Sequence, residues 1–290
     1  MEEGKRYSIS ASLFIFLLST SVSETVSEPA EGVACKHFVL VHGSCHGAWS
    51  WYKVITPLKS WGHKVSALDL GGSGINPLQP MQMQSISEYF GPLSEFMGSL
   101  PKNERVVLVG HSLGGFAISH AMENFPHKIA VAVFLTALMS GPTLNVTILS
   151  QESLKRAGPL LDSRYTYDEG PNNRPTTFVF GPKYLASNVY QHSPLEDLNL
   201  ATTLIRPLRL FGEEDMAKVL TLTHTKYGSV NRVFIISEKD RVIDKDVQRW
   251  MIKRNMPNRV VKISGSDHMV MMSKPLDLCL HLQHIATQYS

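Results

Sequence analysis

The chain has 290 residues, of which 43% are hydrophobic and 18% are charged. This composition supports a folded core and excludes a disordered chain, and the net charge of +3 without any basic run excludes the electrostatic pattern of a nucleic-acid-binding protein. The three cysteines cannot build a disulfide framework, and the length favours one large domain or a core that carries an insertion. We therefore expect a globular protein with small-molecule chemistry.

Residues 1–35 form an extension before the fold, with a short hydrophobic segment over 13–18. This segment is too short to cross a bilayer, so we predict no stable membrane insertion. Lys5 and Arg6 before it and small residues after it give the proportions of a cleaved signal peptide, and a disordered extension is the alternative. The protein is expected to be secreted if the segment is a signal peptide and cytoplasmic otherwise.

From residue 36 onward, short β-branched runs alternate with amphipathic segments. The apolar runs predict strands at 38–41, 64–68, 105–109, 129–135, 232–236 and 259–263. Helical spacing of apolar residues predicts helices over 86–100, from the segment after Ser112 to about 124, over 247–254 and over 278–289. Strands that alternate with helices imply an α/β fold, with a mostly parallel sheet covered on both faces.

The alternation is lost between residues 140 and 229, where prolines, glycines and short mixed segments predominate. We predict that this segment is an insertion over the core. The core would then have a first part at 36–139 and a second part at 230–290.

The best candidate for chemistry is Gly110-His-Ser112-Leu-Gly114, which fits the pattern Gly-x-Ser-x-Gly. The pattern alone is weak, but here it follows a strongly apolar strand and precedes a helix-forming segment, the context of a nucleophile elbow. The sharp turn would strain Ser112, and side chains in place of the two glycines would clash with neighbouring backbone. We predict Ser112 as a nucleophile exposed at the carboxyl edge of the sheet.

A serine hydroxyl needs a base to accept its proton. In folds with this elbow the acid and then the histidine follow the serine along the chain, each on a loop after a later strand. His268 comes just after the strand that ends at Ile263, so it is the predicted base.

The acid must lie between the serine and the histidine, at the end of a strand. Asp240 comes just after the strand over 232–236 and would hold the imidazole in the right tautomer. Glu238 and Asp215 are competing candidates, whereas Asp267 adjoins the base in sequence and is expected to point elsewhere.

Two backbone N–H groups should stabilise the oxyanion that forms during acyl transfer. The first belongs to Leu113, directly after the nucleophile, and the second should come from the loop after the first core strand. In that loop Gly43 allows a tight turn and Ser44 is the predicted donor. Base, acid and donors all come from the chain, so no metal and no organic cofactor is implied.

Residues 37–52, which begin His-Phe-Val-Leu-Val-His-Gly-Ser-Cys-His-Gly, resemble the opening of the plant methylesterase family of α/β-hydrolases. That family includes methyl salicylate esterase, polyneuridine aldehyde esterase and hydroxynitrile lyases. Residues 110–115, 227–234 and 265–275 match further stretches of it, so the resemblance covers about residue 36 to the end. It implies an α/β-hydrolase fold with the insertion as a cap, and it implies the same site: Ser112, Asp240 and His268 as the triad, with Ser44 and Leu113 as oxyanion donors.

Divergent members of this family carry other residues at diagnostic positions. Hydroxynitrile lyases of the rubber-tree and cassava type have a lysine directly after the base, where this chain has Met269, and another lyase type has an asparagine in place of Gly43. Methylketone synthases, which decarboxylate 3-keto acids, resemble this chain through the cap, but they have an alanine in place of Ser112 and no glycine after the strand-end histidine.

The resemblance therefore implies a carboxylic ester hydrolase that cleaves methyl esters of small plant acids or hormones through an acyl-enzyme. The expected partner is a small-molecule ester. A hydroxynitrile lyase, a 3-keto acid decarboxylase and a ligand receptor of low turnover are the alternatives. The sequence does not determine which acyl group is bound, nor whether the protein forms a homodimer.

Overall fold

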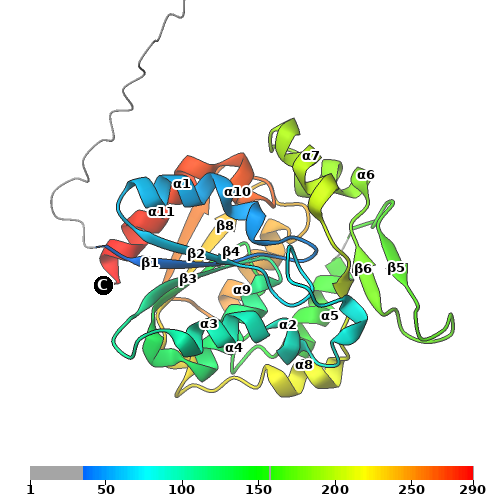
Figure 1. The fold of residues 1–290 in the computed structure, drawn as a ribbon, viewed down its shortest axis with the longest axis horizontal. Coiled ribbons are helices and arrows are strands. Elements are labelled where there is room, and N and C mark those ends of the chain that lie inside the picture. The colour runs from blue at the N-terminus through cyan, green and yellow to red at the C-terminus, as the bar shows by residue number, and fades with distance from the viewer. Residues whose placement is uncertain (1–34, 157, 290) are drawn as a thin grey trace, which may run out of the picture.

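The computed structural model describes residues 35–156 and 158–289, so the predicted signal-like segment lies outside the described residues. Within them, a parallel sheet has six strands in the order β2-β1-β3-β4-β8-β9 (Figure 1). Its strands are β1 (His37–Val41), β2 (Lys64–Leu68), β3 (Val106–His111), β4 (Ile129–Leu135), β8 (Arg232–Ser237) and β9 (Arg259–Ile263). The predicted mostly parallel sheet is confirmed.

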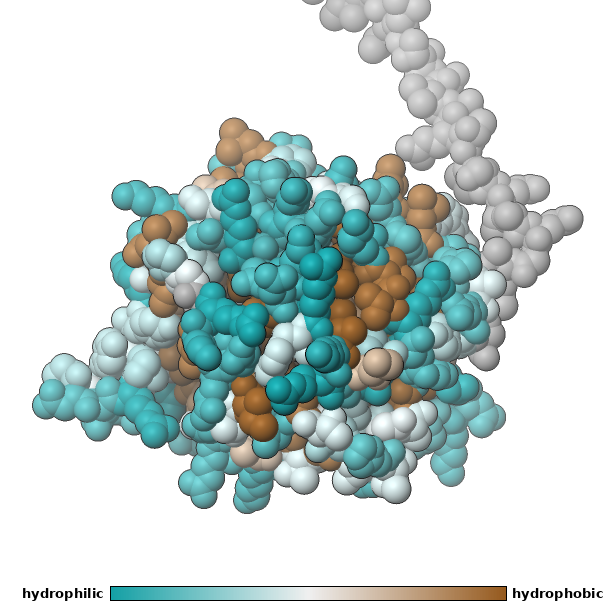
Figure 2. Space-filling view, turned by 180° about the vertical axis from the view of Figure 1, so that it is seen from behind, coloured by the Kyte–Doolittle hydropathy of each residue, from teal (hydrophilic) through white to brown (hydrophobic). Residues whose placement is uncertain are grey.

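The burial of each strand explains its sequence pattern. Central strands β3 and β4 are buried at every position, and their apolar runs have no alternation because both faces are covered. Edge strand β9 alternates between exposed and buried residues at its carboxyl end. Figure 2 shows a mostly hydrophilic surface on one side of the molecule, with hydrophobic residues in separate patches. The apolar residues therefore lie mainly in the core.

Helices cover both faces of the sheet, with α1, α10 and α11 on one face and α2, α3 and α4 on the other (Figure 1). The bounds of these helices and of α9 are as follows: α1 (Tyr52–Ser60), α2 (Ile86–Tyr89), α3 (Gly91–Ser99), α4 (Gly114–Asn124), α9 (Lys245–Arg254), α10 (Val270–Ser273) and α11 (Pro275–Gln288). In the described part of the chain, no helix is both long and apolar enough to cross a membrane.

One helix differs from the prediction. The segment over 86–100 is two helices, α2 and α3, which meet at Phe90. Pro92 lies in the first turn of α3, where its missing N–H costs nothing, whereas in the middle of a continuous helix its ring would clash with the preceding turn. The apolar spacing is continuous across this break and therefore did not reveal it.

The segment between β4 and β8, which we call the insertion, lies mostly beyond one end of the sheet (Figure 1). It contains an antiparallel sheet of three very short strands, ordered β5-β6-β7. Its elements are α5 (Val146–Arg156), β5 (Arg164–Thr166), β6 (Thr177–Val179), α6 (Pro182–Tyr184), a π-helix (Leu185–Val189), α7 (Leu195–Leu204), β7 (Leu208–Arg209) and α8 (Glu213–Val219).

The strand register brings the loops of interest to one edge. Val41 at the end of β1 pairs with Gly110 near the end of β3, and Leu135 at the end of β4 pairs with His111. Because all these strands are parallel, the loops that follow them meet at the same edge of the sheet.

Candidate active site

Ser112 lies in the turn between β3 and α4, as the motif predicts. Its φ angle of 53° is in the left-handed region, which is strained for a residue with a side chain. A Cβ atom on Gly114 would lie 2.5 Å from the carbonyl oxygen of His42, and one on Gly110 would lie 2.9 Å from the carbonyl oxygen of Gly114. The predicted clashes are confirmed, so only glycine fits at either position.

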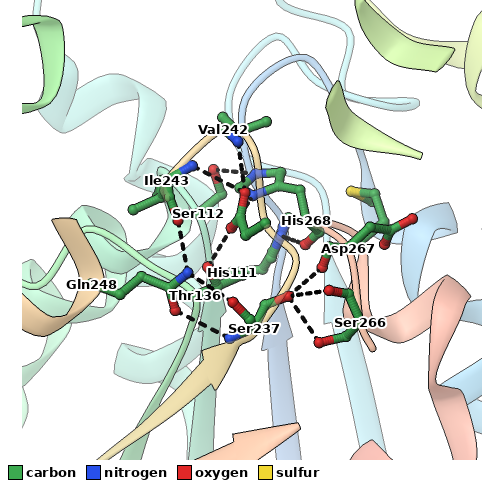
Figure 3. Close-up of polar contacts among 12 residues, drawn as sticks. His111, Ser112, Thr136, Ser237, Val242, Ile243, Gln248, Ser266, Asp267 and His268 are labelled. Carbon is green, nitrogen blue, oxygen red and sulfur yellow. Dashed lines mark hydrogen bonds and ion pairs between the residues drawn. The ribbon is translucent and has the colours of Figure 1, made fainter. Parts of the chain in front are cut away.

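The three predicted triad side chains lie in one hydrogen-bonded chain (Figure 3). Ser112 Oγ is 3.0 Å from His268 Nε2, and His268 Nδ1 is 2.8 Å from Asp240 Oδ2. They come from the loops after β3, β9 and β8, and each is at most 7% exposed. Side chains far apart in sequence are therefore brought together at a buried position.

Four donors surround the carboxylate of Asp240. Oδ1 accepts hydrogen bonds from the backbone N–H groups of Val242 (2.7 Å) and Ile243 (3.0 Å), and Oδ2 accepts one from Thr136 Oγ1 (2.5 Å) besides that from His268. A carboxylate that only accepts requires the imidazole to carry its proton on Nδ1. The lone pair of Nε2 then faces the serine hydroxyl, as a general base requires.

The three other carboxylates considered for the acid do not contact His268. Their partners are Gly265 and Lys262 for Glu238, Ser85 and Ile86 for Asp215, and His192 and Ser193 for Asp267. Asp267 points away from the imidazole and toward the insertion, and burial raises the pKa of its carboxyl group.

The predicted oxyanion donors lie next to the nucleophile. A Cβ atom on Gly43 would be 2.7 Å from Ser112 Cβ, so the turn at Gly43 and the elbow are in direct contact. Among the described residues, neither the Ser44 N–H nor the Leu113 N–H has a hydrogen-bond acceptor. Both donors are therefore available for a bound oxyanion.

No pattern in the sequence indicates the contacts that His42 makes. Its Nδ1–H donates to the carbonyl of Gly43 (2.8 Å), and its Nε2 accepts from the N–H of Leu70 (3.1 Å). Because the peptide unit is planar, fixing the Gly43 carbonyl also fixes the direction of the Ser44 N–H. The imidazole of His42 thus orients the predicted donor.

His46 holds the other side of the same turn. Its Nδ1–H donates to the carbonyl of Ser44 (2.7 Å), and burial lowers the pKa of His46 to about 3, so the ring is neutral. Cys45, between these residues, has a φ angle of 63°. The turn is therefore strained and depends on side-chain partners for its shape.

Two further residues hold the backbone beside the predicted base. His111 Nε2–H donates to the carbonyl of His268 (2.8 Å), and its ring packs on that imidazole with centroids 4.7 Å apart. Ser237 Oγ–H donates to the carbonyl of Asp267 (2.6 Å) (Figure 3). Neither contact has a local sequence signal, because each joins the last residue of one strand to the loop that follows another.

A cavity of about 280 Å³ adjoins the elbow between the core and the insertion. Its apolar lining includes Leu113, Phe116, Leu138, Leu210, Phe211 and Met216. A second cavity of about 270 Å³ shares part of this lining and extends toward Arg174. Within the residues described, no group of three or more histidine, cysteine and acidic side chains could hold a metal ion. The arrangement suits an apolar acyl group beside a serine nucleophile.

The chain was compared with known proteins. Residues 38–281 match the model of the alpha/beta hydrolase family. Methyl jasmonate esterase 1 of Vitis vinifera is 54% identical over 88% of this chain and 98% of its own length. Salicylic acid-binding protein 2 of Nicotiana tabacum is 43% identical over 88% of this chain and 98% of its own. Tomato methylketone synthase I in complex with 2-tridecanone superposes with a TM-score of 0.86 at 52% identity, over 89% of this chain and 100% of that one.

These similarities confirm the α/β-hydrolase fold and the resemblance to plant methylesterases. The similarity extends over 88% and 89% of this chain, at identities well above those that indicate a shared fold alone. The chain belongs to the alpha/beta hydrolase family, in the branch that contains the plant methylesterases.

Proposed function

We propose that the protein hydrolyses methyl esters of small apolar acids by a serine-dependent mechanism. The observation that carries this proposal is the chain of hydrogen bonds from Ser112 through His268 to Asp240, with the two free N–H groups beside it. The names of similar proteins, which include methyl jasmonate esterase and methylesterases, support the same reaction.

In the first half of the reaction, His268 Nε2 takes the hydroxyl proton while Ser112 Oγ attacks the ester carbonyl. The Ser44 and Leu113 N–H groups donate to the oxyanion, and Asp240 stabilises the imidazolium. The imidazolium then gives its proton to the departing methoxide oxygen, which leaves as methanol. In the second half, His268 activates a water that attacks the acyl-enzyme, which releases the acid and restores the serine.

A decarboxylase of 3-keto acids is a second candidate, favoured by the 52% identity to methylketone synthase I. Decarboxylation needs no serine nucleophile, whereas ester hydrolysis does. Methanol release should therefore be measured with the methyl esters of salicylate, jasmonate, indole-3-acetate and a 3-keto acid. Methanol from any of them supports the esterase, whereas carbon dioxide from the free 3-keto acid without methanol from any ester would replace it.

The cavity next to the elbow is expected to hold the acyl group. Ser153 of α5 lines it, and the Ser153 hydroxyl has no hydrogen-bond partner within the described residues. Ser153→Trp should fill this space and lower kcat/KM for bulky acyl esters by about tenfold or more, mainly through KM, while methyl acetate is spared. Kinetics with both substrates check this. Lys155→Trp, on the same helix but outside the cavity lining, is the control, and an equal loss in both variants would contradict the assignment.

A further inference from the structure

Four consecutive residues of the insertion, Tyr190–Ser193, contact three of the four loops that carry the candidate site. We call them the clasp. They follow the π-helix, which ends with the N–H of Tyr190 donating to the carbonyl of Leu185 (2.8 Å). A π-helix is rare and is often found at functional positions. The clasp begins directly after it.

The first clasp residue contacts the oxyanion turn. Tyr190 Oη–H donates to His46 Nε2 (2.7 Å), and the two rings stack with centroids 5.8 Å apart. The opposite nitrogen of His46 donates to the carbonyl of Ser44, so one imidazole joins the insertion to the turn. Tyr190 is 2% exposed and does not line the cavity next to the elbow.

The other clasp residues contact the loops of the acid and the base. Gln191 Nε2 donates to the carbonyl of Lys239, the residue before Asp240 (2.7 Å). The N–H of His192 (2.9 Å) and the hydroxyl of Ser193 (2.8 Å) both donate to Oδ2 of Asp267, the residue before His268. Each contact thus lies one or two residues from Ser44, Asp240 or His268.

We propose that the clasp is a positioning element that keeps the oxyanion turn, the acid loop and the base loop at fixed separations. The three loops follow different strands, and the turn is strained at Cys45, so the strand register alone does not fix their relative positions. Small errors in such separations are costly because catalytic groups act only when they are held in the productive geometry. This inference rests on the proposed ester hydrolysis, since it assigns the clasp to that site.

The test compares two tyrosines that each donate one hydrogen bond between the core and the insertion. Tyr190→Phe removes the bond to His46, and Tyr52→Phe removes a bond of 2.6 Å to Asp197 of α7, which involves no residue of the clasp or of the three loops. Tyr190→Phe should lower kcat by about tenfold and leave KM within about twofold, for small and bulky methyl esters alike. Tyr52→Phe should leave both constants unchanged.

The base end of the clasp gives a second test. Ser193→Ala removes one donor to Asp267 and should lower kcat, whereas Ser193→Thr keeps the hydroxyl and should restore it. The rate at which an alkyl fluorophosphonate labels Ser112 should fall in parallel, and this readout needs no ester substrate. If the wild-type protein is labelled but releases no methanol, the proposed ester hydrolysis is wrong, whereas the clasp proposal is not affected. The clasp proposal would be wrong if Tyr190→Phe and Ser193→Ala kept the wild-type kcat and labelling rate. It would also be wrong if these variants raised KM without lowering kcat.

Discussion

Replacement of Ser112 by alanine should lower kcat for methyl-ester hydrolysis by about 10⁵-fold or more. The variant has no atom that can form the acyl-enzyme, and His268 then has no hydroxyl from which to take a proton. Only stabilisation by the oxyanion donors and substrate binding remain, and these give a small residual rate over water. Methanol release by wild type and variant, at equal protein concentration, measures the effect.

The fold of this variant should be intact, because among the described residues Ser112 Oγ makes a hydrogen bond only with the imidazole of His268. Thermal unfolding should therefore give nearly the same midpoint as the wild type. Ser119→Ala, which removes another buried serine hydroxyl from the helix after the elbow, is the matched control and should retain activity. If Ser112→Ala released methanol at a rate within tenfold of the wild-type rate, the serine-dependent mechanism would be wrong.

Asp240→Asn should lower kcat by about 10⁴-fold. The four groups around this carboxylate all donate, so an amide NH₂ must face either the two backbone N–H groups or the donors from Thr136 and His268. Either orientation places donor against donor. If the amide faces His268, the imidazole proton moves to Nε2, and the ring can no longer accept the serine proton.

Glu238→Gln is the matched control for this variant, because Glu238 is on the same loop and its partners are Gly265 and Lys262 rather than the imidazole. It should keep wild-type kcat. A large loss in Glu238→Gln together with near-normal rates in Asp240→Asn would assign the acid to Glu238 instead. The pH dependence of kcat should be recorded for both variants, so that a shifted optimum is not mistaken for lost activity.

The sequence predicted the six core strands because buried strands have strong local signals. The chain order of serine, acid and histidine pointed to three candidate residues, which the structure brings together. Fully buried strands have unbroken runs of apolar residues. The order of serine, acid and histidine along the chain restricts each candidate residue to the end of a strand. The short strands of the insertion have two or three residues, which is too few for any period to show. The apolar spacing is continuous across Pro92, so spacing alone predicts one helix where the structure has two.

The contacts of the histidines in the oxyanion turn could not be predicted from the sequence. The partner of His46 lies 144 positions away in the insertion, and a neutral buried imidazole has no sequence signature that separates it from a surface one. Likewise, Asp240 and Glu238 lie two residues apart, and only the directions of their side chains distinguish them.

The contact between Gly43 and Ser112 also limits the order in which this site can change during evolution. Any side chain at position 43 would meet Ser112 Cβ at 2.7 Å and displace either the turn or the nucleophile. In a lineage that still depends on acyl transfer, such a change would be eliminated by selection. Once the serine hydroxyl is lost, the same displacement no longer affects hydrolysis, and position 43 can vary. Loss of this glycine is therefore expected only in relatives whose reaction does not depend on an acyl-enzyme.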